Sequence, residues 1–179
     1  SEFLAGLKQE AFIERLGPAT LQRAAQLCGK TNQFNLTTRR YGPAELSAMM
    51  ADPSVRAYTL SLADAFGDNG IVGFAVLRLR GAEAEIDTLL MSCRVLGRQV
   101  EQAFASRLAA SAWESGARVL LGRRIPTPKN GQTMDFYPKL GFEPAGEGLY
   151  RLAFPKTLPL PGGIRVTAGP LSPSGGRLS

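Results

Sequence analysis

The chain has 179 residues, of which 44% are hydrophobic and 20% charged, and its mean hydropathy is −0.05. This composition excludes a disordered chain, and apolar runs such as 70–77 are far shorter than the roughly 18 residues of a membrane-spanning helix, so we expect one globular domain with no membrane partner. With 21 Lys and Arg against 15 Asp and Glu, the net charge of +6 favours an anionic ligand, an acidic partner protein or an ordinary basic surface.

Missing residue types exclude whole classes of active site. The chain has no histidine, which removes Ser-His-Asp and Cys-His schemes and every His-containing metal site. Cys28 and Cys93 are too far apart in sequence for a CxxC zinc motif, so we expect no metal, and two isolated thiols suit a cytoplasmic location. The basic residues are dispersed and not interleaved with aromatic ones, so we expect no nucleic-acid partner.

The first half of the chain predicts a strand, two helices and three strands. A short strand is expected over 9–14, and apolar residues at spacings of three and four predict a helix over 18–28, with a second over 43–50. Residues rich in β-branched side chains and leucine then predict strands over 55–62, 71–79 and 85–91. The Asn-Gly pair within 68–70 predicts the hairpin turn between the first two of these strands, so the middle of the chain is an antiparallel meander.

The second half returns to a helical pattern. Val100, Ala103, Phe104, Leu108 and Ala112 share one face of a helix that Gly116 ends. A short buried strand over 119–121, a polar loop, a short helix to about 140 and a final strand pair follow. The Pro- and Gly-rich stretch 155–179 is typical of a tail or linker, in which only 164–167 could add a strand, and it suggests a chain cut from a longer protein. The predicted folded domain is therefore 1–154.

The stretch 87–101, DTLLMSCRVLGRQVE, is the first candidate binding site. A predicted strand leads through a glycine-containing turn into a helix, whose free backbone N–H groups carry the positive end of the helix dipole. This arrangement can hold a pyrophosphate group. The candidate cofactor-binding residues are Arg94, Val95, Leu96, Gly97, Arg98 and Gln99. An ordinary strand–turn–helix with its arginines in solvent is the alternative.

Three further residues are candidates for catalysis. Asp87 lies on the strand that leads to the turn, and its face depends on the strand register. Cys93 lies beside Arg94 and a helix N-terminus, which favour a thiolate able to carry an acyl group, although a small residue at a strand end is the simpler interpretation. Tyr137, in the stretch KNGQTMDFYPKLGF (129–142), could donate a proton to a leaving thiolate, or it is a core tyrosine.

The loop over 30–40 crowds hydrogen-bond donors and acceptors beside few apolar groups. It either bonds to itself as an ordered loop or lines a polar ligand. The candidate substrate-binding residues are Asn32, Gln33, Asn35, Thr37, Arg39 and Arg40.

The pattern R-x-x-G-x at 94–98, with N-x-x-x-x-x-F-Y-x-x-L-G-F at 130–142, resembles the GNAT acyltransferase superfamily. This resemblance implies an α/β fold with a mixed, mostly antiparallel sheet flanked by helices. In it the strands over 85–91 and 119–121 run parallel and splay apart to form a slot for the pantetheine arm. It also implies a carboxylate base at Asp87, cofactor contact by Asn130, and an acyl-acceptor side bordered by the loop over 30–40.

A closer resemblance covers the chain to about residue 154. The stretches QLCGKTNQFNLTTRRY (26–41), FGDNGIVG (66–73), IDTLLMSCRVLGR (86–98) and IPTPKN (125–130) resemble the C-terminal region of FkbH-like proteins. Those proteins join a haloacid-dehalogenase-like domain to a GNAT-like domain and load a glyceryl unit from 1,3-bisphosphoglycerate onto an acyl carrier protein in polyketide biosynthesis. The metal-binding Asp-x-Asp motif of their first domain is not in this chain.

The resemblance therefore implies a domain that binds coenzyme A or phosphopantetheine and assists acyl or glyceryl transfer to an acyl carrier protein. Its haloacid-dehalogenase-like partner would lie in the parent protein or act in trans. One alternative is a non-catalytic docking module for the carrier protein, which Gln99 in place of a Gly or Ala and Pro138 directly after Tyr137 favour. The other is a standalone N-acetyltransferase that uses acetyl-CoA.

Overall fold

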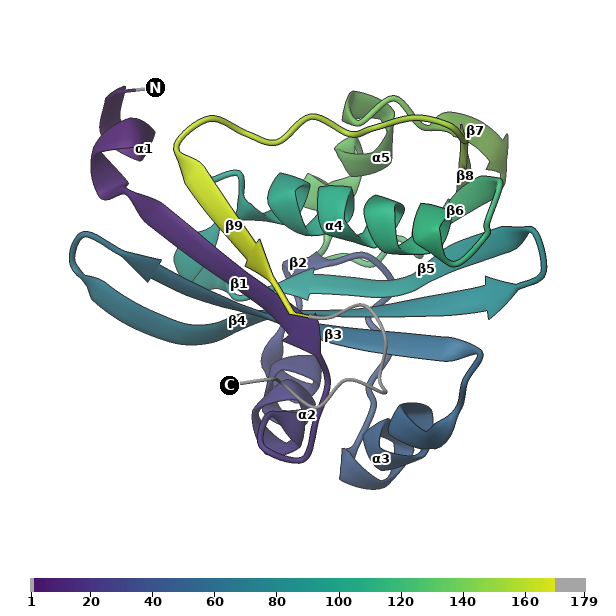
Figure 1. The fold of residues 1–179 in the computed structure, drawn as a ribbon, viewed down its shortest axis with the longest axis horizontal. Coiled ribbons are helices and arrows are strands. Elements are labelled where there is room, and N and C mark those ends of the chain that lie inside the picture. Colours follow the sequence, from purple (N-terminus) through teal and green to yellow (C-terminus); the bar gives the residue numbers. More distant parts are fainter. Residues whose placement is uncertain (1, 170–179) are drawn as a thin grey trace.

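The structure, a computed structural model, describes residues 2–169 and consists of a nine-stranded mixed sheet with helices on both faces (Figure 1). The order of the strands is β7-β8-β6-β5-β4-β3-β1-β9, and the short β2 pairs with β5 beside this path. The strands are β1 (Gln9–Arg15), β2 (Phe34–Asn35), β3 (Val55–Asp64), β4 (Gly67–Arg80), β5 (Glu83–Met91), β6 (Val119–Arg123), β7 (Glu143–Gly146), β8 (Leu149–Ala153) and β9 (Ile164–Ala168).

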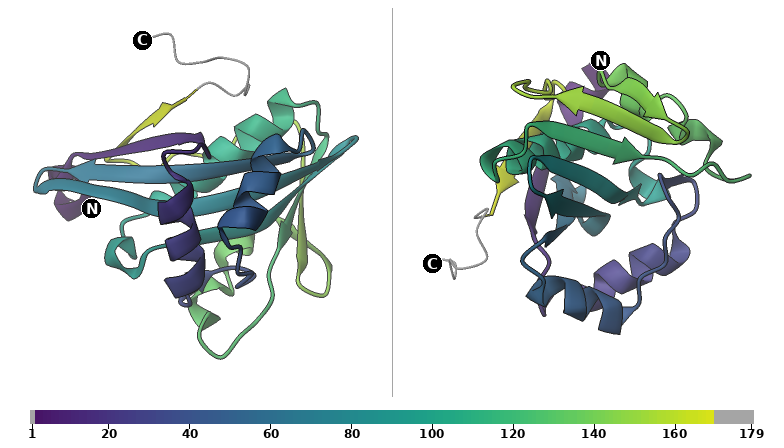
Figure 2. Two further views of the ribbon diagram at one scale, coloured as in Figure 1. Left: turned by 90° about the horizontal axis from the view of Figure 1, so that it is seen from below. Right: turned by 90° about the vertical axis from the view of Figure 1, so that its right-hand side faces the viewer.

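The helices form one layer on each side of the sheet (Figures 1 and 2). The α-helices are α1 (Glu2–Leu7), α2 (Leu21–Lys30), α3 (Pro43–Ala51), α4 (Val100–Glu114) and α5 (Phe136–Lys139), and short 3-10 turns occupy η1 (Cys93–Val95) and η2 (Gly131–Thr133). Helices α2 and α3 cover one face, while α4 and α5 cover the other. In the part of the chain that the structure describes, no helix is long and apolar enough to cross a membrane.

Each face of the sheet has its own apolar core. Leu89 of β5 packs in the cluster that includes Phe104 of α4, whereas its neighbour Leu90 packs in the cluster that includes Leu27 of α2 and Leu46 of α3. Successive side chains of a strand point to opposite faces, so a strand buried on both sides is apolar at nearly every position. In β5 this applies to Leu89–Met91, three consecutive apolar residues that are all buried.

The predicted fold class is confirmed, including the parallel pair at the centre of the sheet. Strands β5 and β6 pair in parallel from Glu83 opposite Val119 to Ile86 opposite Gly122, and then separate. The predicted apolar face of α4 is buried throughout. Gly116 follows the helix with a φ of +98°, as expected of a glycine that ends a helix.

Several predicted boundaries differ from the structure. The hairpin between β3 and β4 turns at residues 65–66, so Asn69 and Gly70 lie inside β4. The carboxylate of Asp64 explains the earlier turn, because it accepts hydrogen bonds from the Phe66 N–H (2.8 Å) and from the Asn69 side chain (3.1 Å). Helix α2 begins three residues after Pro18, and the sequence did not predict α1 or β2.

Part of the predicted tail belongs to the folded domain. Strand β9 pairs in parallel with β1, from Gln9 opposite Ile164 to Ile13 opposite Ala168, and Leu158 is buried in the core. The edge of β1 away from β3 would otherwise be an open sheet edge, which β9 covers. Residues 170–179 of the predicted tail lie outside the described part of the chain.

We predict that Gly122→Ala destabilises the fold by about 1–3 kcal/mol, the cost of overpacking a core. A Cβ atom at Gly122 would lie 2.4 Å from Cε1 of the Tyr137 ring, which is itself buried. The measurement is chemical denaturation, with Gly29→Ala as the control. Gly29 is helical and a Cβ there meets nothing within 4 Å, so the control should be neutral or more stable. Equal stability of Gly122→Ala and wild type would contradict this packing.

Candidate functional site

The two edges of β5 have different partners. One edge pairs with β4 along the whole strand, whereas the other pairs with β6 only as far as Ile86. Val76 of β4 lies opposite Thr88 and Leu77 lies opposite Ile86, so Asp87 is an extra residue that forms a β-bulge. The bulge lies where β5 and β6 separate. We call this separation, between Asp87–Met91 and the chain that follows Gly122, the fork.

Residues 34–37 lie in the fork and bond to both of its sides; we call them the β2 segment. On the β5 side, the Leu36 N–H donates to the Leu89 carbonyl (3.1 Å) and the Thr37 hydroxyl donates to the Asp87 carbonyl (2.9 Å). On the opposite side, the Ile125 N–H donates to the Leu36 carbonyl (2.8 Å). The fork predicted for a pantetheine arm is thus present, and in this structure the chain itself occupies it.

Phe34 separates two cavities that lie on opposite faces of the sheet. A cavity of about 330 Å³ lies between α4 and α5 and includes Glu101 and Lys139 in its lining, while a cavity of about 440 Å³ lies beside α2. Phe34 lines both and is 6% exposed. Its ring packs edge-on against Phe136 of α5, with ring centroids 5.3 Å apart. The aromatic side chain therefore lies between the two cavities.

The carboxylate of Asp87 is buried and fully engaged. It forms ion pairs with Arg39 and with Arg78 (3.1 Å), and it accepts hydrogen bonds from the hydroxyls of Tyr41 (2.7 Å) and Thr88 (2.9 Å). Burial alone would raise the pKa of Asp87, but the Tyr41 hydrogen bond, the Arg39 charge and the other donors together hold the pKa below its usual value. A carboxylate held this way is a weak proton acceptor. Its observed role is structural, because it joins side chains from the loop after α2, from β4 and from β5.

Tyr137 lies in the core at the fork. Its ring covers Gly122, the last residue of β6 that pairs with β5, and packs against Phe142 and Tyr150. Burial raises the pKa of Tyr137 well above its usual value, with smaller contributions from nearby carboxylates. The hydroxyl has no hydrogen-bond partner within the described residues. Its role as a proton donor stays a prediction.

The predicted pyrophosphate site over 94–99 has the expected turn before a helix but fewer free charges than its sequence suggests. Helix α4 starts at Val100 without a side-chain cap, and Gly97 before it has a φ of +81°. Arg98 is committed to an ion pair with the buried carboxylate of Asp64 (2.7 Å). Arg94 is exposed and lines the cavity beside α2. Gln99 adopts a left-handed φ of +65°, where the family pattern has a glycine or alanine. Val95 is buried and Leu96 half-buried, so they offer backbone groups only.

The polar loop bonds mainly to itself and to the fork. The Asn35 side chain donates to the Thr31 carbonyl (3.1 Å) and accepts from the Thr38 N–H (2.8 Å). Arg40 donates to the Cys28 carbonyl and to the side chain of Asn32. These contacts agree with an ordered loop. Of the candidate substrate-binding residues, Asn32 and Gln33 line the cavity beside α2.

Asn130 secures the β2 segment from the far side of the fork. Its amide donates to the Asn35 carbonyl (2.9 Å) and to the Ile125 carbonyl (2.9 Å), and its oxygen accepts from the Thr127 N–H (2.8 Å). Both amide N–H groups are therefore used within the chain. Cofactor contact by Asn130 remains a prediction, whereas its observed role is to join the loop after β6 to the β2 segment.

The two thiols have opposite surroundings. Cys28 is buried between α2 and the sheet, and burial raises its pKa to about 11. Cys93 is exposed at the start of η1 and lines the cavity beside α2. Among residues 2–169, no group of acidic and cysteine side chains could hold a metal ion.

Comparison with solved structures identifies the fold. The ribosomal-protein-S18-alanine N-acetyltransferase from Escherichia coli superposes with a TM-score of 0.60 at 14% identity, over 80% of this chain and 93% of that one. A putative acetyltransferase of the GNAT family from Desulfovibrio desulfuricans superposes with a TM-score of 0.60 at 14% sequence identity, over 80% of this chain and 98% of that one. The chain has the GNAT acetyltransferase fold. A Mycobacterium tuberculosis protein solved in complex with CoA superposes with a TM-score of 0.58 at 16% sequence identity, over 75% of this chain and 72% of that one. No family model matches the sequence, and no curated protein does.

Sequence reasoning missed the residues that close the fork of this GNAT fold. Phe34 and Leu36 alternate with Gln33, Asn35 and Thr37, and this period of two is the signal of a strand. Arg78 and Tyr41 contact the Asp87 carboxylate, but no sequence pattern indicates this, because the three residues are not neighbours in the chain. Glu101 was also missed: burial raises its pKa, and it lies in the first turn of α4.

We predict that Asp87→Asn lowers stability at neutral pH by about 1–3 kcal/mol, because it leaves buried polar groups without their charged partner. The pKa of Asp87 is lowered in the folded state, so its carboxylate stabilises the fold above the unfolded-state pKa of about 3.9, and this contribution is lost as the pH falls through the folded pKa. Denaturation from pH 7 to pH 2 should show a smaller acid-dependent loss in the variant. Identical pH profiles would contradict the assignment.

We also predict that iodoacetamide modifies Cys93 much faster than Cys28 at pH 7.5. Exposure makes the Cys93 sulfur accessible, whereas burial and a pKa of about 11 leave Cys28 almost without thiolate. Peptide mass spectrometry over a time course measures both rates in one sample. Modification of Cys28 first would contradict the structure, and urea should equalise the two rates as a control.

Proposed function

We propose that this chain is a docking domain that holds an acyl carrier protein and its phosphopantetheine arm and does not itself transfer the acyl group. The β2 segment carries this proposal. It lies between the two sides of the fork, where a donor thioester would enter, and its hydrogen bonds to Leu89 and from Ile125 occupy backbone groups on both sides. Asp87, the carboxylate expected to act as a base, is neutralised by Arg39 and Arg78. A docking domain requires neither an open fork nor a free base.

The choice of partner draws on charge and on sequence. The four stretches that resemble FkbH-like proteins point to an acyl carrier protein, and a net charge of +6 suits an acidic partner. The arm ends in a phosphodiester, which an uncapped helix start attracts through its N–H groups and dipole. The start of α4 beside Gly97 meets this requirement. A haloacid-dehalogenase-like domain, joined or separate, would then act on the held carrier.

A transferase is the second candidate, and the Tyr137 hydroxyl favours it. A buried hydroxyl without a partner is rare in folded proteins and calls for a ligand or a movement. Displacing the β2 segment would open the fork, at which the Tyr137 ring covers Gly122. The displacement would break the bonds at Leu36, Thr37 and Asn35, each worth about 1 kcal/mol net, which the amides of an incoming arm could replace. In this candidate, coenzyme A or the carrier's own arm supplies the acyl group.

The test measures binding and transfer on the same samples. Fluorescence anisotropy of a labelled polyketide acyl carrier protein should show binding of the holo form, weaker binding of the apo form, and a loss of affinity with added salt. Intact-mass analysis with acetyl-CoA or 1,3-bisphosphoglycerate as donor should show no acyl or glyceryl group added to the carrier. Transfer catalysed by this chain alone would overturn the docking proposal and support the transferase.

Two variants test the proposed binding site and the candidate catalytic tyrosine separately. Gly97→Trp should weaken binding of the holo carrier, while Gly81→Trp serves as its matched control, because Gly81 also has a positive φ (+57°) and open space around it. Tyr137→Phe should leave both carrier binding and stability unchanged, since it removes a hydroxyl that bonds to none of the described residues. Slower transfer in Tyr137→Phe would instead identify a catalytic tyrosine.

A further inference from the structure

The cavity beside α2 has a polar rim over an apolar floor. It has a volume of about 440 Å³ and lies between α2, residues 31–34, the end of β5 and η1. Leu27, Phe34 and Met91 form its floor and are buried. This size and lining are typical of a site for a small molecule.

Three positive charges line this cavity, and no acidic residue does. They are Arg23 and Lys30 of α2 and Arg94 of η1. Arg23 donates to the Gln26 amide oxygen (3.2 Å) and Arg94 to the Asn69 carbonyl (3.4 Å), both neutral groups. None of the three appears among the ion pairs of the described residues.

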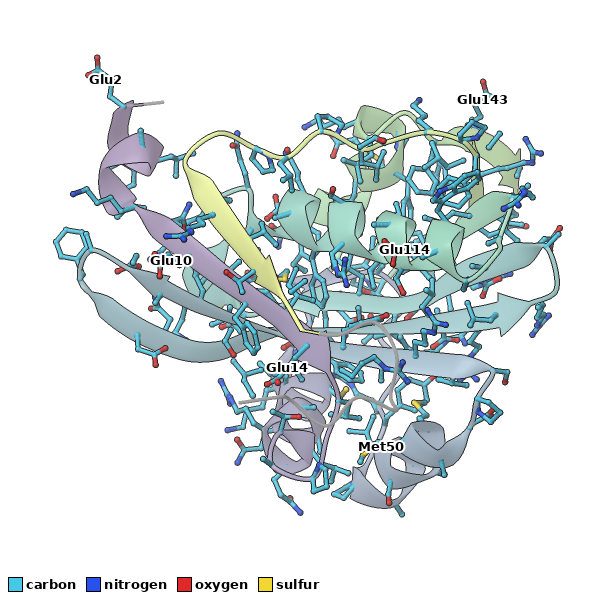
Figure 3. All side chains as sticks on the ribbon, viewed as in Figure 1. Glu2, Glu10, Glu14, Met50, Glu114 and Glu143 are labelled. Atoms are coloured by element: carbon cyan, nitrogen blue, oxygen red, sulfur yellow. The ribbon has the colours of Figure 1, made fainter. Side chains whose placement is uncertain are left out.

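Elsewhere in the described chain, two buried carboxylates already form ion pairs with arginines. Arg39 and Arg78 pair with Asp87, and Arg98 pairs with Asp64. Exposed carboxylates such as Glu2, Glu10 and Glu143 belong to elements that do not line the cavity (Figure 3). The cavity therefore concentrates positive charge that the protein leaves uncompensated.

Polar groups at the rim complete the site. The Ser92 hydroxyl, which accepts from the Arg94 N–H (3.4 Å), keeps its own proton available for a ligand. Gln33 is exposed at the rim and adds an amide. We propose that this cavity binds a small organic anion whose carboxylate or phosphate group contacts Lys30, Arg94 and Ser92. The inference does not depend on the proposed docking function, since neither Gly97 nor the start of α4 lines this cavity.

NMR titration of the full 179-residue chain tests the site directly. The probes are sodium phosphate and sodium citrate, with glycerol as an uncharged control and the ionic strength held constant. We expect saturable shifts of the amide signals of Gln33, Ser92 and Cys93 with at least one anion and none with glycerol. The anion that binds more tightly identifies the preferred group. Shifts that never saturate, or that glycerol reproduces, would overturn the proposal.

Charge variants separate a built site from a general attraction to a basic protein. Lys30→Gln and Arg94→Gln should each weaken binding about three- to fivefold, the range for an exposed charge contact. Arg151→Gln makes the same change in net charge at an exposed position on β8 and should leave affinity unchanged. Equal weakening in all three variants would show attraction by net charge alone and overturn the proposal.

The thiol at the rim gives a second, independent measurement. Cys93 lines the cavity, so a bound anion should slow its modification by iodoacetamide in proportion to occupancy. In Lys30→Gln the same degree of protection should require about three to five times more anion. Full occupancy by NMR with an unchanged modification rate would place the anion elsewhere.

Discussion

The bonding of the β2 segment to both sides of the fork is the constraint on which the site depends. The bulge at Asp87 and the end of pairing at Ile86 leave an edge of β5 without its β6 partner, and an unpaired edge needs another source of hydrogen bonds. A pantetheine arm could supply them from outside. Here Leu36 supplies them from within, and Phe34 fills the space that remains between the two faces.

The same arrangement determines what the charged groups can do. Thr37 bonds to the backbone of Asp87, and Arg39 then lies where it can pair with the carboxylate. The stretch 34–39 therefore both closes the fork and pairs with Asp87, the candidate base. Moving residues 34–39 would therefore open the fork and break the Arg39–Asp87 ion pair together, while Arg78, Tyr41 and Thr88 would still hold the carboxylate.

Much of the fold was predictable because its elements repeat strong local patterns. The meander of β3, β4 and β5 and the apolar face of α4 follow from periodicity, and Gly116 ends α4 as predicted, whereas the Asn-Gly pair predicted the wrong hairpin turn. The site was less predictable, because its partners come from distant positions: Arg78 and Tyr41 meet Asp87, and Asn130 meets Asn35 across 95 residues. Two-residue β2 was missed since its alternation is short, and β9 because its proline-rich surroundings resemble a linker.

Hydrogen exchange at the Leu36 and Ile125 amides tests the closed fork most directly. Both N–H groups donate across the fork, to the Leu89 and Leu36 carbonyls. We expect both amides to be protected to a similar degree, and saturating coenzyme A to leave their protection unchanged. Rapid exchange of both amides, or a loss of protection at Leu36 when coenzyme A binds, would show that the fork opens to admit a donor and would rule out a permanently closed fork.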